Sequence, residues 1–118
     1  TQKYREENQP SFETIITNIY LNENEISLMS KLSGNKIVKK RYSYLYNGSG
    51  FGIEIFEGKL QGLLLAEIEA GFQTLFSIDL PKFISEDVTN DSFFEGGYLS
   101  QIDAHKLNAL LITKGISN

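Results

Sequence analysis

Two acidic residues, Glu67 and Glu69, stand two positions apart in the segment GLLLAEIEA, residues 62–70. Alternate side chains of a β-strand point to opposite faces, so an extended backbone here places both carboxylates on one face, beside Leu63 and Leu65. Carboxylate oxygens are the ligands that hard divalent cations such as Mg²⁺ prefer in proteins. The spacing therefore suggests acids that bind a metal ion at the end of a strand.

Cations with the same two-residue spacing occur earlier in the chain. Lys39 and Arg41 would share one face of a strand over residues 36–46, and Glu54 would lie on the polar side of the next strand. If the three strands are neighbours, these cations and carboxylates converge on one surface. Lysine and arginine would there bind phosphate oxygens. That is the layout of a phosphoryl-transfer site that works by positioning and charge neutralisation.

A structural alternative stays open for the same residues. Glu67 and Glu69 could stand on a solvated strand face, and the lysines of KIVKK could protect an edge strand from aggregation. Leu63 and Leu65, however, share the acidic face. Their presence favours a surface that is at least partly enclosed.

The elements that would position these residues are mostly strands. Runs rich in β-branched and aromatic residues predict strands at residues 11–21, 36–46, 51–58 and 62–72, with NGSG as a turn. Short turns between consecutive strands imply antiparallel hairpins. Helices flank this sheet in the prediction, which gives an α+β fold class.

Two helices are predicted from capping signals. Asn22 with Glu25 three residues later forms a capping box, and Gly34 would end that helix. A terminal amphipathic helix is predicted over residues 100–116, with Ser100 as the N-cap and Asp103 in the capping-box position. Its apolar stripe would comprise Ile102, Leu107, Leu110 and Leu111, and Gly115 would end it.

Composition narrows the classes of function. At 118 residues, 41% of them hydrophobic, the chain has the size of one domain with a modest core. The absence of cysteine excludes disulfides, thiolate zinc sites and a cysteine nucleophile, and it favours a cytoplasmic location. A formal net charge of -4 argues against an extended nucleic-acid surface. No apolar run approaches the roughly 20 residues that cross a bilayer, so no membrane partner is expected.

A longer pattern covers roughly residues 36–100. It consists of a Lys-x-Arg-Tyr strand, an aromatic-x-x-acid strand ending in Phe-x-Gly, a Gly-Leu strand ending in Ala-Glu-x-Glu, a Pro-x-aromatic turn and an acid-Val-Thr-x-Asp loop. Its members are Lys39, Arg41 and Tyr42; Phe51, Glu54, Phe56 and Gly58; Gly62, Leu63, Ala66, Glu67 and Glu69; Pro81 and Phe83; and Asp87, Val88, Thr89 and Asp91, followed by Leu99. In order, spacing and chemical type these positions resemble the second half of CYTH domains, the triphosphate-tunnel family that includes inorganic and thiamine triphosphatases and class IV adenylate cyclases.

The resemblance implies a closed antiparallel β-barrel, a tunnel whose basic inner residues bind triphosphate or polyphosphate and whose acids hold Mg²⁺ or Mn²⁺. Arg41 and Lys39 would contact phosphate oxygens. Glu69 and Glu67 would be metal-side acids, and Glu54 would take the place of the acid on the neighbouring strand. The implied activity is a divalent-metal-dependent phosphohydrolase acting on inorganic triphosphate, thiamine triphosphate or a nucleotide.

The Glu-x-Glu-x-Lys strand that opens the family's domain is absent from this chain. The opening TQK matches the end of a Thr-x-Lys strand, which would make Lys3 a further phosphate-binding lysine. We therefore expect residues 1–118 to form the C-terminal portion of a CYTH-like domain, an incomplete antiparallel β-barrel or tunnel with flanking helices. Such a barrel leaves strand edges unpaired, so we expect self-association or an upstream segment that completes it.

Three classes of function stay open at this point. The first is the phosphohydrolase, with class IV adenylate cyclase-like activity as a further member of that class. The second is a degenerate module that binds polyphosphate or a nucleotide without turnover, which the missing acids and arginines favour. The third is a structural or protein-interaction domain, which the terminal helix would serve.

Overall fold

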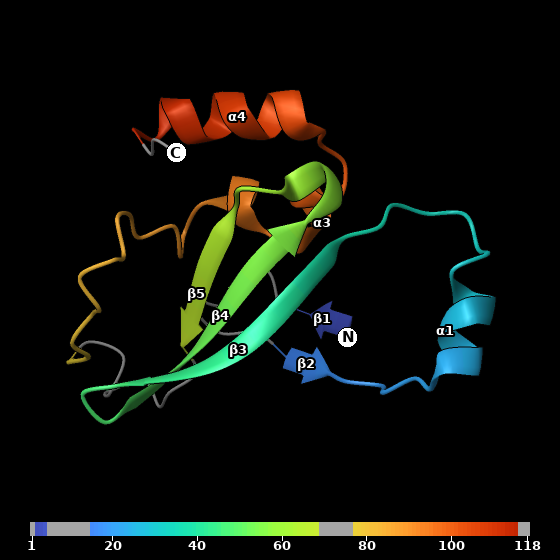
Figure 1. The fold of residues 1–118 in the computed structure, drawn as a ribbon, viewed down its shortest axis with the longest axis horizontal. Coiled ribbons are helices and arrows are strands. Elements are labelled where there is room, and N and C mark those ends of the chain that lie inside the picture. The colour runs from blue at the N-terminus through green and yellow to red at the C-terminus, as the bar shows by residue number, and fades with distance from the viewer. Residues whose placement is uncertain (1, 5–14, 69–76, 116–118) are drawn as a thin grey trace.

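The computed structural model describes residues 2–4, 15–68 and 77–115, and it has an α+β fold (Figure 1). For residues 2–4 and 15 it describes the backbone alone. A three-stranded antiparallel sheet forms the centre, and the C-terminal helices lie over one end of it. In this part of the chain no helix has both the length and the apolar character needed to cross a bilayer.

The central sheet has the strand order β3–β4–β5. Strand β3 spans Val38–Tyr46, β4 spans Ser49–Glu57 and β5 spans Leu64–Ile68. Both pairs of neighbours are antiparallel, which confirms the predicted hairpins. Residues 69–72, the predicted end of the last strand, lie outside the described residues.

The β3–β4 hairpin turns at Asn47 and Gly48, whose φ angles are 47° and 79°. Both angles lie in the left-handed region that two-residue hairpin turns require, and Asn-Gly adopts it at little cost. The turn is shorter than the predicted NGSG because Ser49 and Gly50 already belong to β4. A turn of this length fixes the register of the two strands.

The register sorts the side chains of the sheet onto two faces. Arg41 lies opposite Glu54, and Gly52 lies opposite Glu67. Because strand side chains alternate, one face carries Lys39, Arg41, Gly52, Glu54 and Glu67, and we call it the charged face. The other, which we call the apolar face, carries Tyr42, Tyr44, Ile53, Ile55 and Leu64. The expected convergence of cations and carboxylates on one surface is thus present.

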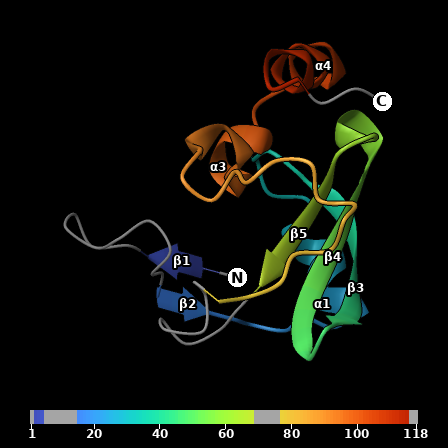
Figure 2. The same ribbon diagram turned by 90° about the vertical axis from the view of Figure 1, so that its left-hand side faces the viewer.

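The hydrophobic core lies at the end of the sheet where η1 (Gly58–Leu60) joins β4 to β5. Helices α3 (Gly96–Leu99) and α4 (Ala104–Thr113) and the turn η2 (Ser92–Phe94) cover that end (Figure 2). The buried cluster comprises Phe56, Leu60, Leu63, Phe94, Leu99, Ile102, Leu107 and Leu111. Burying a side chain of this size contributes about 1.5–3 kcal/mol. This end therefore supplies most of the cohesion of the described fold.

Helix α4 begins later than the predicted start at Ser100. Its N-cap is Asp103, whose carboxylate accepts a hydrogen bond of 2.8 Å from the backbone N–H of Lys106. Ser100 instead closes α3, and its hydroxyl donates to the carbonyl of Gly97 at 2.9 Å. The prediction merged two helices because Ser100 and Asp103 both suit a cap, and only Asp103 has the extended backbone that an N-cap needs.

The predicted apolar stripe is buried as expected, although Ile102 lies just before the N-cap of α4 and not within the helix. Ile102, Leu107 and Leu111 are buried in the core, and Leu110 packs against it half-buried. The helix ends at Thr113, and Gly115 follows with a φ of 71°. The N–H of Gly115 donates to the last turn of the helix, as a left-handed glycine at this position commonly does.

Helix α1 spans Glu23–Met29 and begins at the predicted capping box. The side chain of Asn22 accepts from the N–H of Glu25 at 2.9 Å, and the Glu25 carboxylate accepts from the N–H of Asn22 at 3.1 Å. The predicted end at Gly34 is wrong, because Ser30 already closes the helix. Its hydroxyl donates to a backbone carbonyl in the last turn, which competes with further helix growth.

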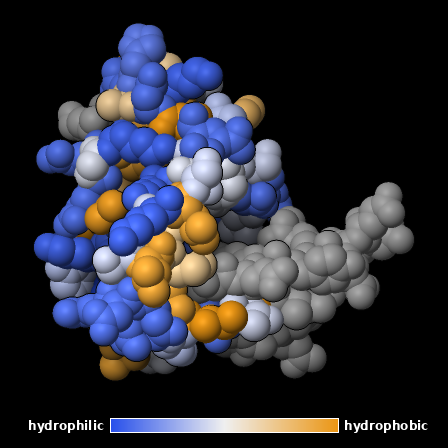
Figure 3. Space-filling model, turned by 90° about the vertical axis from the view of Figure 1, so that its right-hand side faces the viewer, coloured by the Kyte–Doolittle hydropathy of each residue, from blue (hydrophilic) through white to orange (hydrophobic). Residues whose placement is uncertain are grey.

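Helix α1 contributes no residue to the core. None of its side chains is buried, and Figure 1 shows it standing away from the sheet. Its apolar residues Ile26, Leu28 and Met29 are 53%, 65% and 55% exposed. Figure 3 faces this side of the molecule and shows apolar side chains on its surface. The helix is therefore held by its cap rather than by packing.

A second, two-stranded sheet pairs β1 (Gln2–Tyr4) with β2 (Ile15–Thr17). The predicted strand over residues 11–21 is thus shorter in the part that the structure describes, since residues 18–21 are not extended in a ladder. The two sheets share no strand within the described ranges. The closed barrel that the resemblance implies is therefore not formed there.

Candidate functional site

Four charged side chains meet on the charged face. The Nζ of Lys39 lies 2.8 Å from Oε1 of Glu54, and Nη1 of Arg41 lies 3.0 Å from the same oxygen. The same Nη1 also lies 3.0 Å from Oε2 of Glu67. Three adjacent strands thus bring together four of the predicted site residues, two cations and two carboxylates.

Glu54 is the buried member of this group. Its side chain is 5% exposed, whereas those of Lys39 and Arg41 are 41% and 48% exposed. A buried carboxylate is stable only when it is paired and hydrogen-bonded, and Glu54 accepts a charge-assisted bond from each cation. Lys39 also lies over the ring of Phe56, 5.5 Å from its centroid. Glu54 therefore anchors both cations at the border of the core.

Gly52 makes room for the guanidinium of Arg41. A Cβ atom at this position would lie 2.3 Å from Nη2 and 2.4 Å from Cζ of Arg41. Gly52 sits opposite Glu67 in the register, between the strand that carries Arg41 and the strand that carries Glu67. The arginine therefore crosses β4 over the bare backbone of Gly52 to reach Glu67.

The carboxylates of the charged face raise the pKa of Arg41. The hydrogen bond to Glu67 is the largest cause that raises the pKa of Arg41, desolvation opposes it, and the charges of Glu67 and Glu54 add to the rise. Because two carboxylates offset two cations, the group of four is close to neutral as it stands. An anion therefore meets a cation that already has partners.

An open groove of about 440 Å³ runs beside this group, and its lining includes Arg41, Ser43, Gly52 and Glu67. Its size lies within the range of small-ligand sites, roughly 300–1,000 Å³. The hydroxyl of Ser43 adds a neutral donor next to the guanidinium. A ligand in this groove would meet Arg41 and Glu67 together.

Two predicted site residues fall outside what the structure describes. Glu69 follows the end of β5 and lies beyond the described residues. Lys3 is a backbone member of β1, opposite Ile16, and its side chain is likewise not described. Their predicted roles, metal binding for Glu69 and phosphate binding for Lys3, stay predictions.

The described carboxylates are already engaged by cations. Glu54 accepts from Lys39 and Arg41, and Glu67 accepts from Arg41. Among the residues that the structure describes, no group of three or more acidic or histidine side chains could hold a metal ion. These residues alone do not make up a divalent-metal site, so we assign no chemical step to a metal. The metal-side roles of Glu67 and Glu54 stay predictions.

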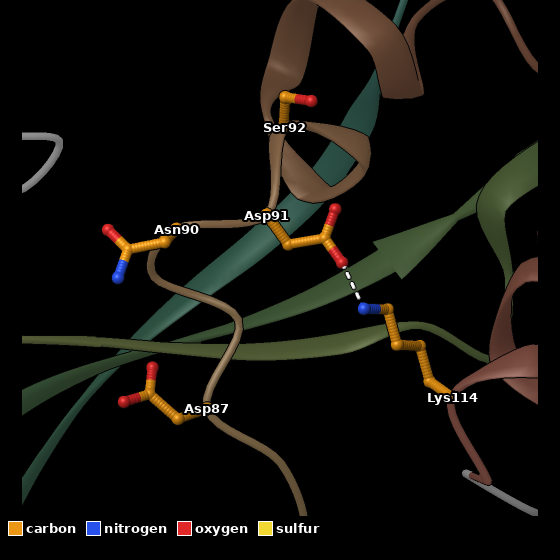
Figure 4. A pocket seen from close by; sticks show the side chains of 5 residues that line it. All are labelled: Asp87, Asn90, Asp91, Ser92 and Lys114. Atoms are coloured by element: carbon orange, nitrogen blue, oxygen red, sulfur yellow. Dashed lines mark ion pairs between the residues drawn. The ribbon is translucent and has the colours of Figure 1, made fainter.

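A second hollow of about 380 Å³ lies near the end of α4 and is lined by Asp87, Asn90, Asp91, Ser92 and Lys114 (Figure 4). The Asp91 carboxylate forms an ion pair with Lys114 and accepts from the N–H of Phe93 at 3.0 Å. Both contacts lower the pKa of Asp91, that with Lys114 more strongly. The ion pair between Asp91 and Lys114 therefore links the start of η2 to the end of α4.

Asp87, an acid of the family-like loop, has a local structural role. Its carboxylate accepts from the backbone N–H of Thr89 at 3.0 Å and from the Thr89 hydroxyl at 2.5 Å. The bond from the hydroxyl is the larger of the two causes that lower the pKa of Asp87. The loop that continues the resemblance therefore contributes turn and bracing contacts in the described structure.

Sequence reasoning missed Gly52. A single glycine inside a strand pattern indicates a bulge or a close approach to the backbone, and FGIE carries that signal two positions before Glu54. The identity of the approaching group depends on the register of three strands. The sequence therefore marks the position but leaves its partner, Arg41, open.

No protein-family model, curated protein or solved structure matches this chain significantly.

Proposed function

We propose that the charged face binds the phosphate chain of a triphosphate-containing substrate, and that the chain belongs to a CYTH-like domain that hydrolyses this substrate with a divalent metal. The observation that carries the proposal is the convergence of Lys39 and Arg41 on one face, where Arg41 lines an open groove. Charge-assisted hydrogen bonds from arginine and lysine are the common contacts of phosphate oxygens.

In this proposal each described residue has a distinct role. Arg41 presents its planar guanidinium to phosphate oxygens from the groove, and Lys39 adds a point charge nearby. Glu54 does not contact the substrate; its buried carboxylate holds both cations in place. Mg²⁺ or Mn²⁺ is expected from the resemblance, with Glu67, Glu69 and Glu54 as the acids to test.

Phosphate release from inorganic triphosphate, with and without Mg²⁺ or Mn²⁺, tests the proposal, with thiamine triphosphate and a nucleoside triphosphate as comparisons. Metal-dependent release is the expected result, and Glu69→Ala should reduce it. Two results would contradict the proposal. The first is phosphate release at the same rate with and without metal, and the second is the absence of both triphosphate binding and phosphate release.

The chain offers a matched pair of lysines as a control. Lys39 lies on the charged face, whereas Lys40 points to the opposite face and pairs with Glu57 at 3.3 Å. Lys39→Ala should weaken triphosphate binding, and Lys40→Ala should leave it unchanged. Equal losses in both variants would indicate a general effect of surface charge rather than a site.

A second candidate function is binding without turnover. It is favoured by the ion pairs that engage the carboxylates of Glu54 and Glu67 and by the lack of a three-acid group among the described side chains. Calorimetric binding of triphosphate without phosphate release under any metal would select this candidate. If the chain shows neither triphosphate binding nor phosphate release, the remaining candidate is a structural or interaction role.

A further inference from the structure

The two carboxylates that hold Arg41 differ in burial. The Glu54 side chain is 5% exposed and shares its Oε1 with Lys39. The Glu67 side chain is 38% exposed and lines the open groove with Arg41. One nitrogen, Nη1, bonds to both carboxylates at 3.0 Å, so the guanidinium lies between a buried partner and an accessible one.

The energies of the two contacts differ for the same reason. An ion pair open to water contributes little to stability, because water and salt compete for both charges. Removing a cation from a buried carboxylate costs more, because water cannot replace the lost contact. Without Arg41, Glu54 would keep its bond from Lys39 but lose one of its two charge-assisted bonds. A competing anion can therefore remove Glu67 from Arg41 far more easily than it can remove Glu54.

We infer that Arg41 exchanges one carboxylate for phosphate: an incoming phosphate group replaces Glu67 at the guanidinium, while Glu54 keeps its contact. Gly52 is the positioning residue of this exchange, because its bare backbone lets the guanidinium lie in the groove where the phosphate arrives. The inference rests on the proposed phosphate binding and adds how that site is opened. In the absence of ligand, Glu67 occupies the place of the phosphate.

Calorimetric titration of inorganic triphosphate into the protein in EDTA tests the exchange without any metal. Glu67→Gln keeps the size and the acceptor oxygen of the side chain but removes its charge. Because the competing ion pair and the repulsion of the ligand both disappear, this variant should bind triphosphate about tenfold more tightly at low salt. The gain should shrink as ionic strength rises.

Gly52→Ala tests the positioning role. The added methyl group displaces the end of a flexible side chain, so the melting temperature should change little while triphosphate affinity falls. In Gly52→Ala/Glu67→Gln the tenfold gain should be lost, because Arg41 no longer lies in the groove. Gly97→Ala, on α3, adds a methyl group with nothing within 4 Å and serves as the control with unchanged affinity.

The outcomes separate the exchange from the proposed function. Tighter binding by Glu67→Gln that disappears in the double variant supports the exchange. If the wild type binds triphosphate and Glu67→Gln binds it with equal or lower affinity, the exchange alone is overturned. A gain that persists in the double variant overturns the role of Gly52. Absence of binding in the wild type and in Glu67→Gln overturns both the exchange and the proposed phosphate binding.

Discussion

Strands β4 and β5 have two ends with different surroundings. At one end Phe56 and Leu63 are each 3% exposed beneath α3 and α4. At the other end Gly52 and Glu67 border an open groove. The covered end stabilises the strands through buried apolar contacts, and the open end presents charged side chains to the groove. Stability and ligand binding are therefore expected to reside at opposite ends of the same strands.

A core substitution at the covered end should have the largest effect. Leu99 is 1% exposed, so Leu99→Ala should lower the free energy of unfolding by about 2–5 kcal/mol through lost burial and a residual cavity. Chemical denaturation measures the loss. Leu64→Ala, at a position 61% exposed on the apolar face, should change it by less than about 0.5 kcal/mol. Similar losses in both variants would break the distinction.

At the open end, Arg41→Ala should act on binding. Loss of a charge-assisted contact should weaken triphosphate binding by about 1.5–3 kcal/mol. Lys39 still pairs with Glu54, so the free energy of unfolding should fall less than in Leu99→Ala. Calorimetry and denaturation on the same variant compare the two effects. A variant that binds normally but unfolds easily would assign Arg41 to stability instead.

The pH dependence of stability should report the ion pair between Asp91 and Lys114 at the covered end. Since the pKa of Asp91 is lowered below its usual 3.8, its contribution is present above that pH and is lost as pH falls through the folded-state pKa. The pKa of Lys114 is raised above 10.5, so its contribution is present below that pH and is lost on further alkalinisation.

Lys114→Met should therefore lower the melting temperature near neutral pH. The difference from the wild type should vanish at both pH extremes, and thermal scans across pH measure it. A difference that is independent of pH would assign the effect to packing of the lysine stem rather than to its charge.

The smallest effect is expected in α1. Ile26→Ala, at a position 53% exposed, should change the free energy of unfolding by less than about 0.5 kcal/mol. Denaturation measures this change as well. A loss above 1 kcal/mol would mean that α1 packs on a surface in solution. Stability would then depend on a third region besides the two ends of the sheet.

Local signals predicted the elements whose boundaries depend on neighbouring residues. The capping box of Asn22 and Glu25, a turn within NGSG and the glycine after the last helix, Gly115, were confirmed for this reason. The helix after Asn22 ended early, and α4 began at Asp103, because those limits depend on competing hydrogen bonds and on tertiary packing. Helix propensity alone does not decide between such limits.

The site was predictable in part. Alternation placed Lys39 and Arg41 on one face, and the idea of neighbouring strands placed them near Glu54 and Glu67. The burial of Glu54 and the passage of Arg41 over Gly52 depend on which residues stand opposite one another across three strands. That information is absent from any single segment, so it required the structure.

The length of the turn at Asn47 and Gly48 determines which side chains of β4 lie on each face of the sheet. Adding or removing one residue there would shift β4 by one position against β3, and the side chains of β4 would change faces. Phe51, Ile53 and Ile55 would then stand beside Arg41, and Glu54 would face the other way. The number of residues in this short loop, even or odd, therefore decides whether β4 presents charged or apolar side chains beside Arg41.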